Sequence, residues 1–287
     1  MQTEFHATTA AAAEREPVSA FIICFNEEQD IEECLKSVQF CDEVVVIDSF
    51  STDRTVEICE RYHARVIQRP WPGYREQKAF GLAATTHEWV LNLDADERVS
   101  PELRENLLAL LRRDWEERRA GVPTTLADGY EVNRTVWYLG RWWRRGGWYP
   151  EFRMRFFRKS KVTWGGTDPH EKPIVDGTQD RIGGEIYHFT YKSFSDQVER
   201  LHRFSSIAAE EEFKKGGRSG WRRLLLNPLL RSFKFFVLKG GFQEGKAGLV
   251  VALAEGYYTF MKYAKLWELE HKEAHLAARR REAANEG

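Results

Sequence analysis

The sequence has no uninterrupted apolar run of the roughly 20 residues that a membrane-spanning helix needs. The best candidate, in the C-terminal third, is interrupted by Lys234 and Lys239. Cysteine is also scarce: the four cysteines lack the close spacing of metal ligands and fall in or beside expected strands and helices. We therefore expect reduced cysteines in the core of a cytosolic protein.

Glycine is absent from residues 24–28, which follow the first apolar run of the chain. A sugar-phosphate nucleotidyltransferase would carry a glycine-rich loop with an arginine at this place. A dinucleotide oxidoreductase would open its first helix with Gly-X-Gly-X-X-Gly, where the pyrophosphate binds. Neither of these two classes fits the sequence.

What is present is a regular alternation of short apolar runs and amphipathic segments in the N-terminal third. We expect strands at residues 18–25, 43–47 and 64–68, helices at residues 30–40, 53–62 and 74–84, and then a strand ending in acidic residues. This order argues for right-handed crossovers and an α/β fold with a mostly parallel sheet covered by helices on both faces. A chain of 287 residues, 42% of them hydrophobic, can bury one such core and an appendage.

The last of these strands, beginning at residue 88, stops on two carboxylates, Asp94 and Asp96. Alternate side chains of a strand point to the same face, so we expect both carboxylates to face the crevice at the strand's carboxyl end. Such oxygen donors suit Mg²⁺ or Mn²⁺, which completes its shell with phosphate oxygens and water. The alternative is a solvated loop or a cap, because Ser100 begins a helix just beyond.

Polar residues also follow the first two expected strands: Asn26 and Glu27 after the first, and Asp48 and Ser49 after the second. Parallel strands end at one edge of a sheet, so these residues should lie on the same rim as Asp94. This convergence makes a ligand site more credible than any one of the pairs does alone.

Three segments carry a resemblance to the family 2 glycosyltransferases: residues 21–28 (FIICFNEE), 44–55 (VVVIDSFSTDRT) and 92–97 (NLDADE). Within that family the chain is most similar to the bacterial lipopolysaccharide core β-glucosyltransferases, a similarity strengthened by residues 77–81, 165–171, 239–242 and 262–267. The resemblance covers nearly everything between residues 17 and 267. It implies a GT-A type nucleotide-binding sheet, and transfer of a sugar from a nucleotide-sugar with inversion at the anomeric carbon.

The resemblance also implies roles for the donor site. Asp48 would lie near the base and ribose of the donor, with Asn26 and Glu27 on the same rim. Many family members carry a second aspartate where this chain has Ser49, so the base is left open, with UDP, in UDP-glucose, as the best expectation.

The same resemblance assigns the diphosphate and metal contacts. Lys78 would approach the diphosphate, Asp94 would lie near the ribose and the metal, and Asp96 would coordinate Mg²⁺ or Mn²⁺. A metal and a cation would neutralise the charge that develops when the bond to a nucleoside diphosphate breaks.

A general base must deprotonate the acceptor hydroxyl as it attacks. Residues 164–173 hold the candidates, and Glu171, at the place of the family's His-Glu pair, is our choice. His170 would orient Glu171 or contact phosphate. Two alternatives stay open: Asp168 as the base, or an ordinary polar loop in which Asp168 caps a turn.

Residues 136–150 interleave aromatic residues with arginines. Aromatic faces cover sugar rings and guanidinium groups bind carboxylate or phosphate, so we expect an acceptor site for an acidic saccharide or phosphorylated glycolipid. It would use Arg141, Trp142, Arg144 and Arg145. Core aromatics beside solvated arginines are the alternative, and we do not expect a nucleic-acid partner.

The net charge of −1 conceals a basic region, because residues 214–246 hold nine Lys and Arg against one acid, Glu244. Leucines and aromatics are interleaved with them, as in helices that lie in the headgroup plane of an anionic leaflet. An ordinary helical cap on the sheet domain is the alternative. A further helix at residues 248–268 should pack through a face that includes Val250, Leu253 and Tyr257.

Together these inferences predict a disordered tail (residues 1–16), a GT-A domain (residues 17–200) and a helical, membrane-associating extension (residues 201–287). The function we expect is metal-dependent, inverting transfer of a hexose, plausibly glucose, to the inner core of a lipopolysaccharide or similar glycolipid. The protein would be cytoplasmic and peripheral on the inner face of the cell membrane. The alternatives are a polyprenyl-linked saccharide or a protein as the acceptor, or a non-catalytic membrane-binding scaffold.

Overall fold

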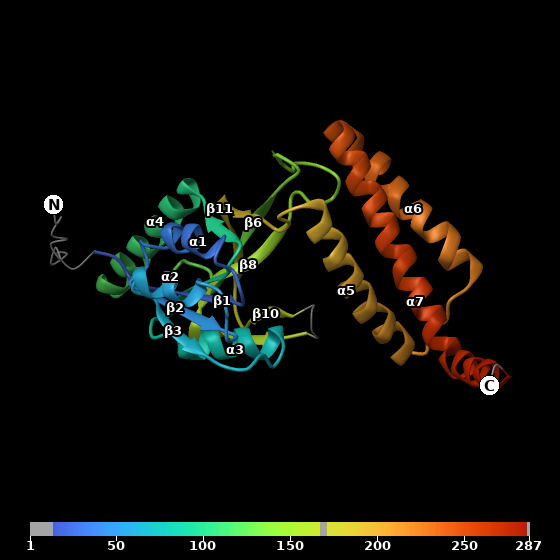
Figure 1. Cartoon of the computed structure of the whole chain (residues 1–287). Coiled ribbons are helices and arrows are strands. Elements are labelled where there is room, and N and C mark those ends of the chain that lie inside the picture. The colour runs from blue at the N-terminus through green and yellow to red at the C-terminus, as the bar shows by residue number, and fades with distance from the viewer. Residues whose placement is uncertain (1–13, 167–170, 286–287) are drawn as a thin grey trace, which may run out of the picture. The chain divides into compact units, whose positions relative to one another are not determined.

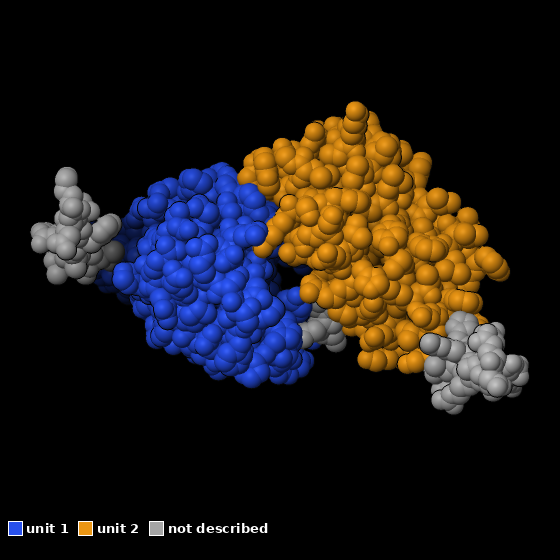
Figure 2. All heavy atoms as spheres, viewed as in Figure 1, with its two compact units in different colours: residues 1–135, 151–189 blue, residues 136–150, 190–287 orange. Residues whose placement is uncertain are grey.

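The computed structural model describes residues 14–166 and 171–285, with side chains to residue 272 (Figure 1). The chain divides into two compact units (Figure 2). Unit 1 comprises Met1–Thr135 and Glu151–Phe189, and unit 2 comprises Val136–Pro150 and Thr190–Gly287. Unlike the division expected at residue 200, this one groups residues 136–150 with the C-terminal helices.

Unit 1 is built on a mixed sheet with the strand order β3-β2-β1-β4-β8-β6-β11-β5. The first four strands in this order are parallel, as predicted: β1 (Val18–Cys24), β2 (Glu43–Asp48), β3 (Arg65–Gln68) and β4 (Trp89–Asp94). The rest of the sheet contains β5 (Glu97–Val99), β6 (Gly129–Tyr138), β8 (Phe152–Arg158) and β11 (Gln179–His188). Here β8 runs antiparallel to β4 and β6, and β5 antiparallel to β11, so the prediction of a mostly parallel sheet holds for the first half only.

Alternate side chains of β1 point to opposite faces of the sheet, so unit 1 has one hydrophobic core on each face. Ala20 and Ile22 face one core, which α1 (Ile31–Ser37), α2 (Thr55–Arg61) and α4 (Pro101–Arg119) complete. Phe21 and Ile23 face the other, beneath α3 (Tyr74–Ala84) and a small sheet of β9 (Val162–Gly165) and β10 (Lys172–Val175). The expectation of helices on both faces is confirmed (Figure 1).

Unit 2 is mostly helical; its residues 136–150 contain the end of β6, the short strand β7 (Arg141–Trp142) and the loop that follows. Its long helices are α5 (Phe194–Lys214) and α7 (Gly245–Asn285), and α6 (Asn227–Phe233) is flanked by π-helical turns at Arg222–Leu226 and Lys234–Leu238. A single turn of 3₁₀ helix, Gly241–Glu244, precedes α7. Both α5 and α6 pack against α7 (Figure 1). Residues 136–150 join this unit because Tyr138 and Trp143 share a core with Phe235 and Val251.

The predicted helix at residues 248–268 lies within α7, and its predicted packing face, which also included Ala254, is right only in part. Ala254 is buried, but Val250, Leu253 and Tyr257 are exposed, and the neighbouring Val251 and Ala252 are buried in their place. Gly256 lies close to α6, because a Cβ atom at this position would collide with Ser232. The side of α7 with small side chains therefore faces α6. Among the described residues, none of the helices combines the length and apolar content needed to cross a bilayer.

Candidate active site

The polar strand ends predicted from sequence do meet at one edge of the sheet. In the parallel registers Cys24 lies opposite Asp48, and Ile23 lies opposite Asp94. Asp94 is the last residue of β4, but Asp96 lies in the tight turn that leads to β5. The prediction that both aspartates lie on one strand is therefore wrong, and each carboxylate has its own neighbours.

Lys78 joins two acidic residues that the sequence analysis had treated separately. Its Nζ lies 3.0 Å from Oδ1 of Asp94 and 3.0 Å from Oε1 of Glu171, which directly precedes β10. The side chain of Lys78 is only 6% exposed and that of Glu171 only 9%. Within the described part of the chain, the buried Oε2 of Glu171 has no hydrogen-bond partner. Lys78 therefore holds one oxygen of Glu171 and leaves the other available.

The position of Lys78 depends on how closely α3 approaches the sheet. A Cβ atom at Gly81 would lie 2.6 Å from Cδ2 of Phe21 in β1, which is far inside van der Waals contact. Gly81 is one helical turn beyond Lys78, on the same side of α3. The missing side chain thus lets the helix lie close enough for Lys78 to reach the end of β4.

The other side of Asp94 is held by Arg155 of β8. Nη2 of Arg155 lies 2.9 Å from Oδ2 of Asp94 and 2.6 Å from Oε1 of Glu97, and its Nη1 donates to Asn92 at 2.9 Å. Burial alone would raise the pKa of Asp94, but the positive charges of Lys78 and Arg155 outweigh it and hold the pKa well below its ordinary value. Asp94 is therefore an ionised carboxylate fixed by two cations.

Asp96 faces a histidine that the sequence analysis did not single out. Nε2 of His188 lies 3.4 Å from Oδ2 of Asp96. The pairing of β11 with β5 brings the two together, with His188 opposite Glu97 in the ladder. In the part of the chain that the structure describes, the buried Nδ1 of His188 has no hydrogen-bond partner. His188 is far from Asp96 in sequence and stands in no local motif, so only the strand pairing reveals it.

The match of a family model decides what kind of protein carries this site. Residues 19–168, just over half of the chain, match the model described as glycosyl transferase family 2. The chain belongs to this family. It is 28% identical over 259 residues to the lipopolysaccharide core biosynthesis glycosyltransferase LpsC of Rhizobium meliloti, covering 88% of this chain and 92% of that one. It is 30% identical over 271 residues to an uncharacterized glycosyltransferase of Rickettsia typhi, covering 91% and 90%.

Two solved structures are more distant from this family 2 glycosyltransferase. Glucosyl-3-phosphoglycerate synthase from Mycobacterium tuberculosis, solved with Mn²⁺, UDP and glucosyl-3-phosphoglycerate, is 26% identical with a TM-score of 0.33, covering 42% of this chain and 44% of that one. TarS residues 1–349 from S. aureus is 16% identical with a TM-score of 0.44, covering 90% and 91%.

The family 2 resemblance implies a divalent metal, and the residues present can be tested against it. No group of three His, Cys, Asp or Glu side chains gathers at a possible metal position within residues 14–166 and 171–272. Asp96 and His188 offer one carboxylate and one imidazole at the rim. This donor set fits an ion that takes most of its ligands from a diphosphate and water. Asp94 is the weaker candidate ligand, because Lys78 and Arg155 already bind its oxygens.

The carboxylate predicted to lie near the donor's base is fully buried. Oδ2 of Asp48 accepts hydrogen bonds from the backbone N–H of Ser51 at 3.0 Å and from Nε2 of Gln68 at 2.9 Å. Asp48 therefore orders the loop after β2. Asn26 helps to fix the same loop, because its Oδ1 accepts from the N–H of Thr52 at 2.8 Å.

Other donor-site predictions involve the backbone beside this loop. The N–H of Glu27 donates to Oγ1 of Thr55 at 2.8 Å, and the carbonyl of Glu27 accepts from the first turn of α1. Oγ of Ser49 accepts from Nε2 of Gln77 at 3.1 Å, which connects the loop to α3. The donor-binding roles of Asn26, Glu27 and Asp48 stay predictions.

The residues predicted to bind the acceptor lie in unit 2. Arg141 donates to the backbone carbonyl of Glu244 at 2.8 Å. The ring of Trp142 packs edge-on against Trp137 at 5.0 Å, and the guanidinium of Arg144 lies 4.7 Å from the ring centre of Tyr149. Arg144 and Arg145 are exposed. The acceptor role of these four residues stays a prediction. The roles predicted for Asp168 and His170 fall on positions outside the described residues.

Proposed function

We propose that this protein transfers a hexose, glucose from UDP-glucose, to the inner core of a lipopolysaccharide or a similar glycolipid, with inversion at the anomeric carbon. The acceptor class is supported by the relative named as a lipopolysaccharide core biosynthesis glycosyltransferase, which aligns with most of both chains. The observation that carries the chemistry is the cluster of Lys78, Asp94 and Glu171 at the carboxyl edge of the sheet.

In this proposal Glu171 is the general base. The acceptor hydroxyl oxygen attacks the anomeric carbon while its proton passes to Oε2 of Glu171, the oxygen left without a hydrogen bond. The bond between the anomeric carbon and the diphosphate oxygen breaks, and UDP leaves with the electron pair. Attack from the side opposite the leaving group inverts the anomeric carbon.

Lys78 acts as a positioning residue for this step. It fixes Oε1 of Glu171 and, through Asp94, ties the base to the end of β4.

Asp96 and His188 are the residues that would hold Mg²⁺ or Mn²⁺. When bound there, the ion would supply positive charge for the departing diphosphate. Arg155 and Glu97 keep the end of β4 rigid beside it, because Glu97 also accepts a hydrogen bond from the N–H of Asp94 at 3.1 Å.

A panel of nucleotide-sugars tests the proposal. Purified protein is incubated with each donor and with core oligosaccharide, in Mg²⁺, Mn²⁺ or a chelator, and nucleoside diphosphate release is measured. We expect UDP-glucose to be turned over in a metal-dependent way. Asp96→Asn should abolish turnover and weaken Mn²⁺ binding measured by electron paramagnetic resonance with UDP present.

Asp180→Asn is the matched control, because Asp180 is an exposed aspartate of β11 and the substitution makes the same change in charge. It should retain turnover. Release from none of the donors, or release that survives both the chelator and Asp96→Asn, would contradict the proposal.

A further inference from the structure

One face of the helical segment at residues 221–238 exposes large apolar side chains where solvent-facing helices are normally polar. Trp221 is 81% exposed, Leu229 67% and Leu238 69%. The exposed apolar residues recur about every four residues, singly or in adjacent pairs, which places them in one row. We call this row the apolar face: Trp221, Leu225, Leu226, Leu229, Leu230, Phe233, Val237 and Leu238.

The apolar face is not the side through which this segment packs within unit 2. That side is occupied by Phe235, which is buried, and by Ser232, against which Gly256 of α7 lies closely. Figure 1 shows α6 lying alongside α7. The segment therefore uses one side for the fold and leaves a second, apolar side exposed, and an exposed apolar surface of this kind marks an interaction surface.

Positive charge accompanies the apolar face. Two arginines of the segment are neutralised: Arg223 by Glu212 at 3.1 Å and Arg231 by Glu255 at 2.8 Å. In the described part of the chain, Arg222, Lys234 and Lys239 have no such acidic partner. The surface thus combines apolar area with unneutralised cations.

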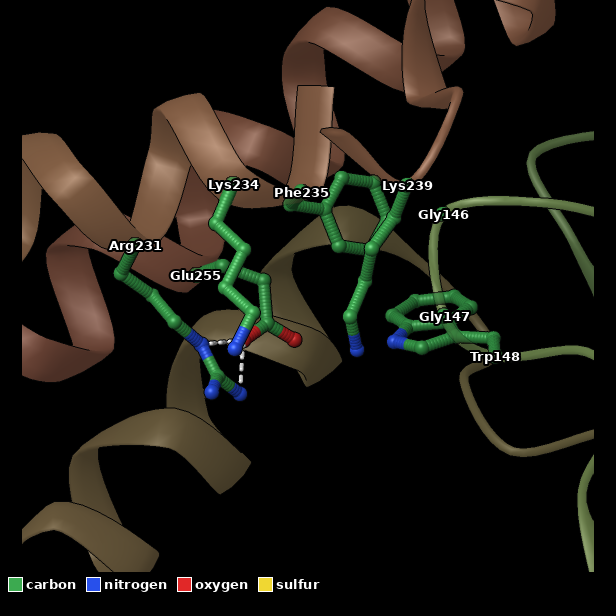
Figure 3. Close-up of a pocket in the computed structure, with 8 residues that line it drawn as sticks. All are labelled: Gly146, Gly147, Trp148, Arg231, Lys234, Phe235, Lys239 and Glu255. Atoms are coloured by element: carbon green, nitrogen blue, oxygen red, sulfur yellow. Dashed lines mark hydrogen bonds and ion pairs between the residues drawn. The ribbon is translucent and has the colours of Figure 1, made fainter. Parts of the chain in front are cut away.

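Two of these cations line a small pocket of about 40 Å³ (Figure 3). Arg231 and Glu255 form their ion pair at one end of it, and the side chain of Lys239 extends past Gly147. The Lys239 ammonium group lies against Gly147, a glycine with a φ of +83°. The pocket therefore offers Lys234 and Lys239 to an anion.

We propose that unit 2 binds the surface of an anionic phospholipid bilayer, with the apolar face in the interfacial region and Lys234 and Lys239 contacting headgroup phosphates. A helix with a large apolar face flanked by cations has this preference, because apolar burial and attraction to anionic lipid add together. A second copy of the chain is the poorer occupant, since two surfaces of equal positive charge repel. Binding of unit 2 to the bilayer does not depend on the proposed reaction. If the acceptor is carried by a lipid, this binding would bring the enzyme to it.

Vesicle sedimentation tests this proposal. Full-length protein is mixed with vesicles of phosphatidylglycerol and phosphatidylcholine, or of phosphatidylcholine alone, without any sugar donor. We expect binding to the anionic vesicles that weakens with added salt. Leu229→Glu should lower the partition coefficient at least about tenfold, because a leucine side chain would be replaced by a charge in the interface.

Val122→Glu is the matched control. Val122 is an exposed apolar residue of unit 1, so the substitution adds the same charge without touching the apolar face, and vesicle binding should be retained. The double variant Lys234→Gln and Lys239→Gln should reduce binding to the anionic vesicles and flatten its dependence on salt. If this variant binds as the wild type does, the headgroup contact is refuted.

Two results would overturn the whole proposal. One is equal vesicle binding by Leu229→Glu and Val122→Glu, or no binding by the wild type. The other is a wild-type dimer in light scattering that Leu229→Glu converts to a monomer, which would show that a second copy covers the face. None of these measurements uses a nucleotide-sugar donor. A negative result would therefore refute the membrane-binding proposal without bearing on the proposed transferase reaction.

Discussion

Lys78→Met removes the buried positive charge that pairs with both Glu171 and Asp94, while keeping a side chain of similar length. At 3.0 Å and an effective dielectric constant of about 20, each ion pair contributes roughly 5.5 kcal/mol of Coulomb attraction. Desolvation of the three groups offsets much of this, and breaking a buried pair typically costs about 3–5 kcal/mol. Because the Asp94 side chain is 27% exposed and Arg155 still binds it, we expect a loss of about 3 kcal/mol in the free energy of unfolding at pH 7.

The loss should depend on pH in a defined direction. In the wild type the pKa of Asp94 is held well below its ordinary value, so its contribution to stability is complete above about pH 4 and is lost only at lower pH. Without Lys78, the pKa of Asp94 should move upward. The advantage of the wild type over the variant should therefore stay constant between pH 7 and about pH 4 and shrink at lower pH, where Asp94 becomes protonated in the variant before it does in the wild type.

Urea unfolding followed by circular dichroism at pH 7 and pH 3 measures both quantities. Lys36→Met is the matched control, because Lys36 lies on the surface of α1, 2.7 Å from Glu33, in a solvent-exposed ion pair that should contribute little. The reasoning is refuted if Lys36→Met and Lys78→Met lower stability equally. A Lys78→Met deficit that is the same at both pH values would refute the role assigned to the carboxylates.

The remaining predictions concern the base and the approach of α3. Glu171→Gln should lower kcat at least about a hundredfold with the KM for UDP-glucose unchanged, since a base acts in the chemical step; a raised KM at constant kcat in steady-state kinetics would reassign Glu171 to binding. Gly81→Ala should lower the free energy of unfolding by about 1–3 kcal/mol, because its Cβ would collide with Phe21. The control is Gly220→Ala, whose Cβ meets open space, and equal urea midpoints for the two variants would show that the close approach is unimportant.

The parallel half of the sheet could be predicted because its strands are buried on both faces and read as continuous apolar runs. β1 and β2 begin and end within one residue of the predicted positions, and α3 matches its prediction at both ends. The antiparallel half was harder to anticipate. β11 carries a partly exposed, mixed sequence, and it reveals itself through its pairing with β5, which is distant in the chain.

Some parts of the candidate site can likewise be predicted from local sequence, and others depend on contacts between distant segments. The acidic strand ends were visible because each stands at the end of a local apolar run, and the family resemblance pointed to Lys78 and Glu171. The ion pairs that join Lys78 to Asp94 and Glu171 depend on how α3 and β10 approach the sheet, which no local pattern encodes. His188 illustrates the limit most clearly, since a single histidine at a strand end has many ordinary explanations until Asp96 is found 3.4 Å away.

The route of the chain between the two units limits how the protein can be dissected. It enters unit 2 at Val136, returns to unit 1 at Glu151 and leaves again at Thr190. Trp143 lies in the first segment of unit 2, residues 136–150, and is fully buried. It shares a core with Phe235 and Val251, which lie in the second segment, residues 190–287. A shortened protein ending near residue 190 would therefore expose an indole and a tyrosine ring that the helices normally shield, and its aggregation would say nothing about lipid. Point substitutions on the surface are the sound way to separate the roles of the two units.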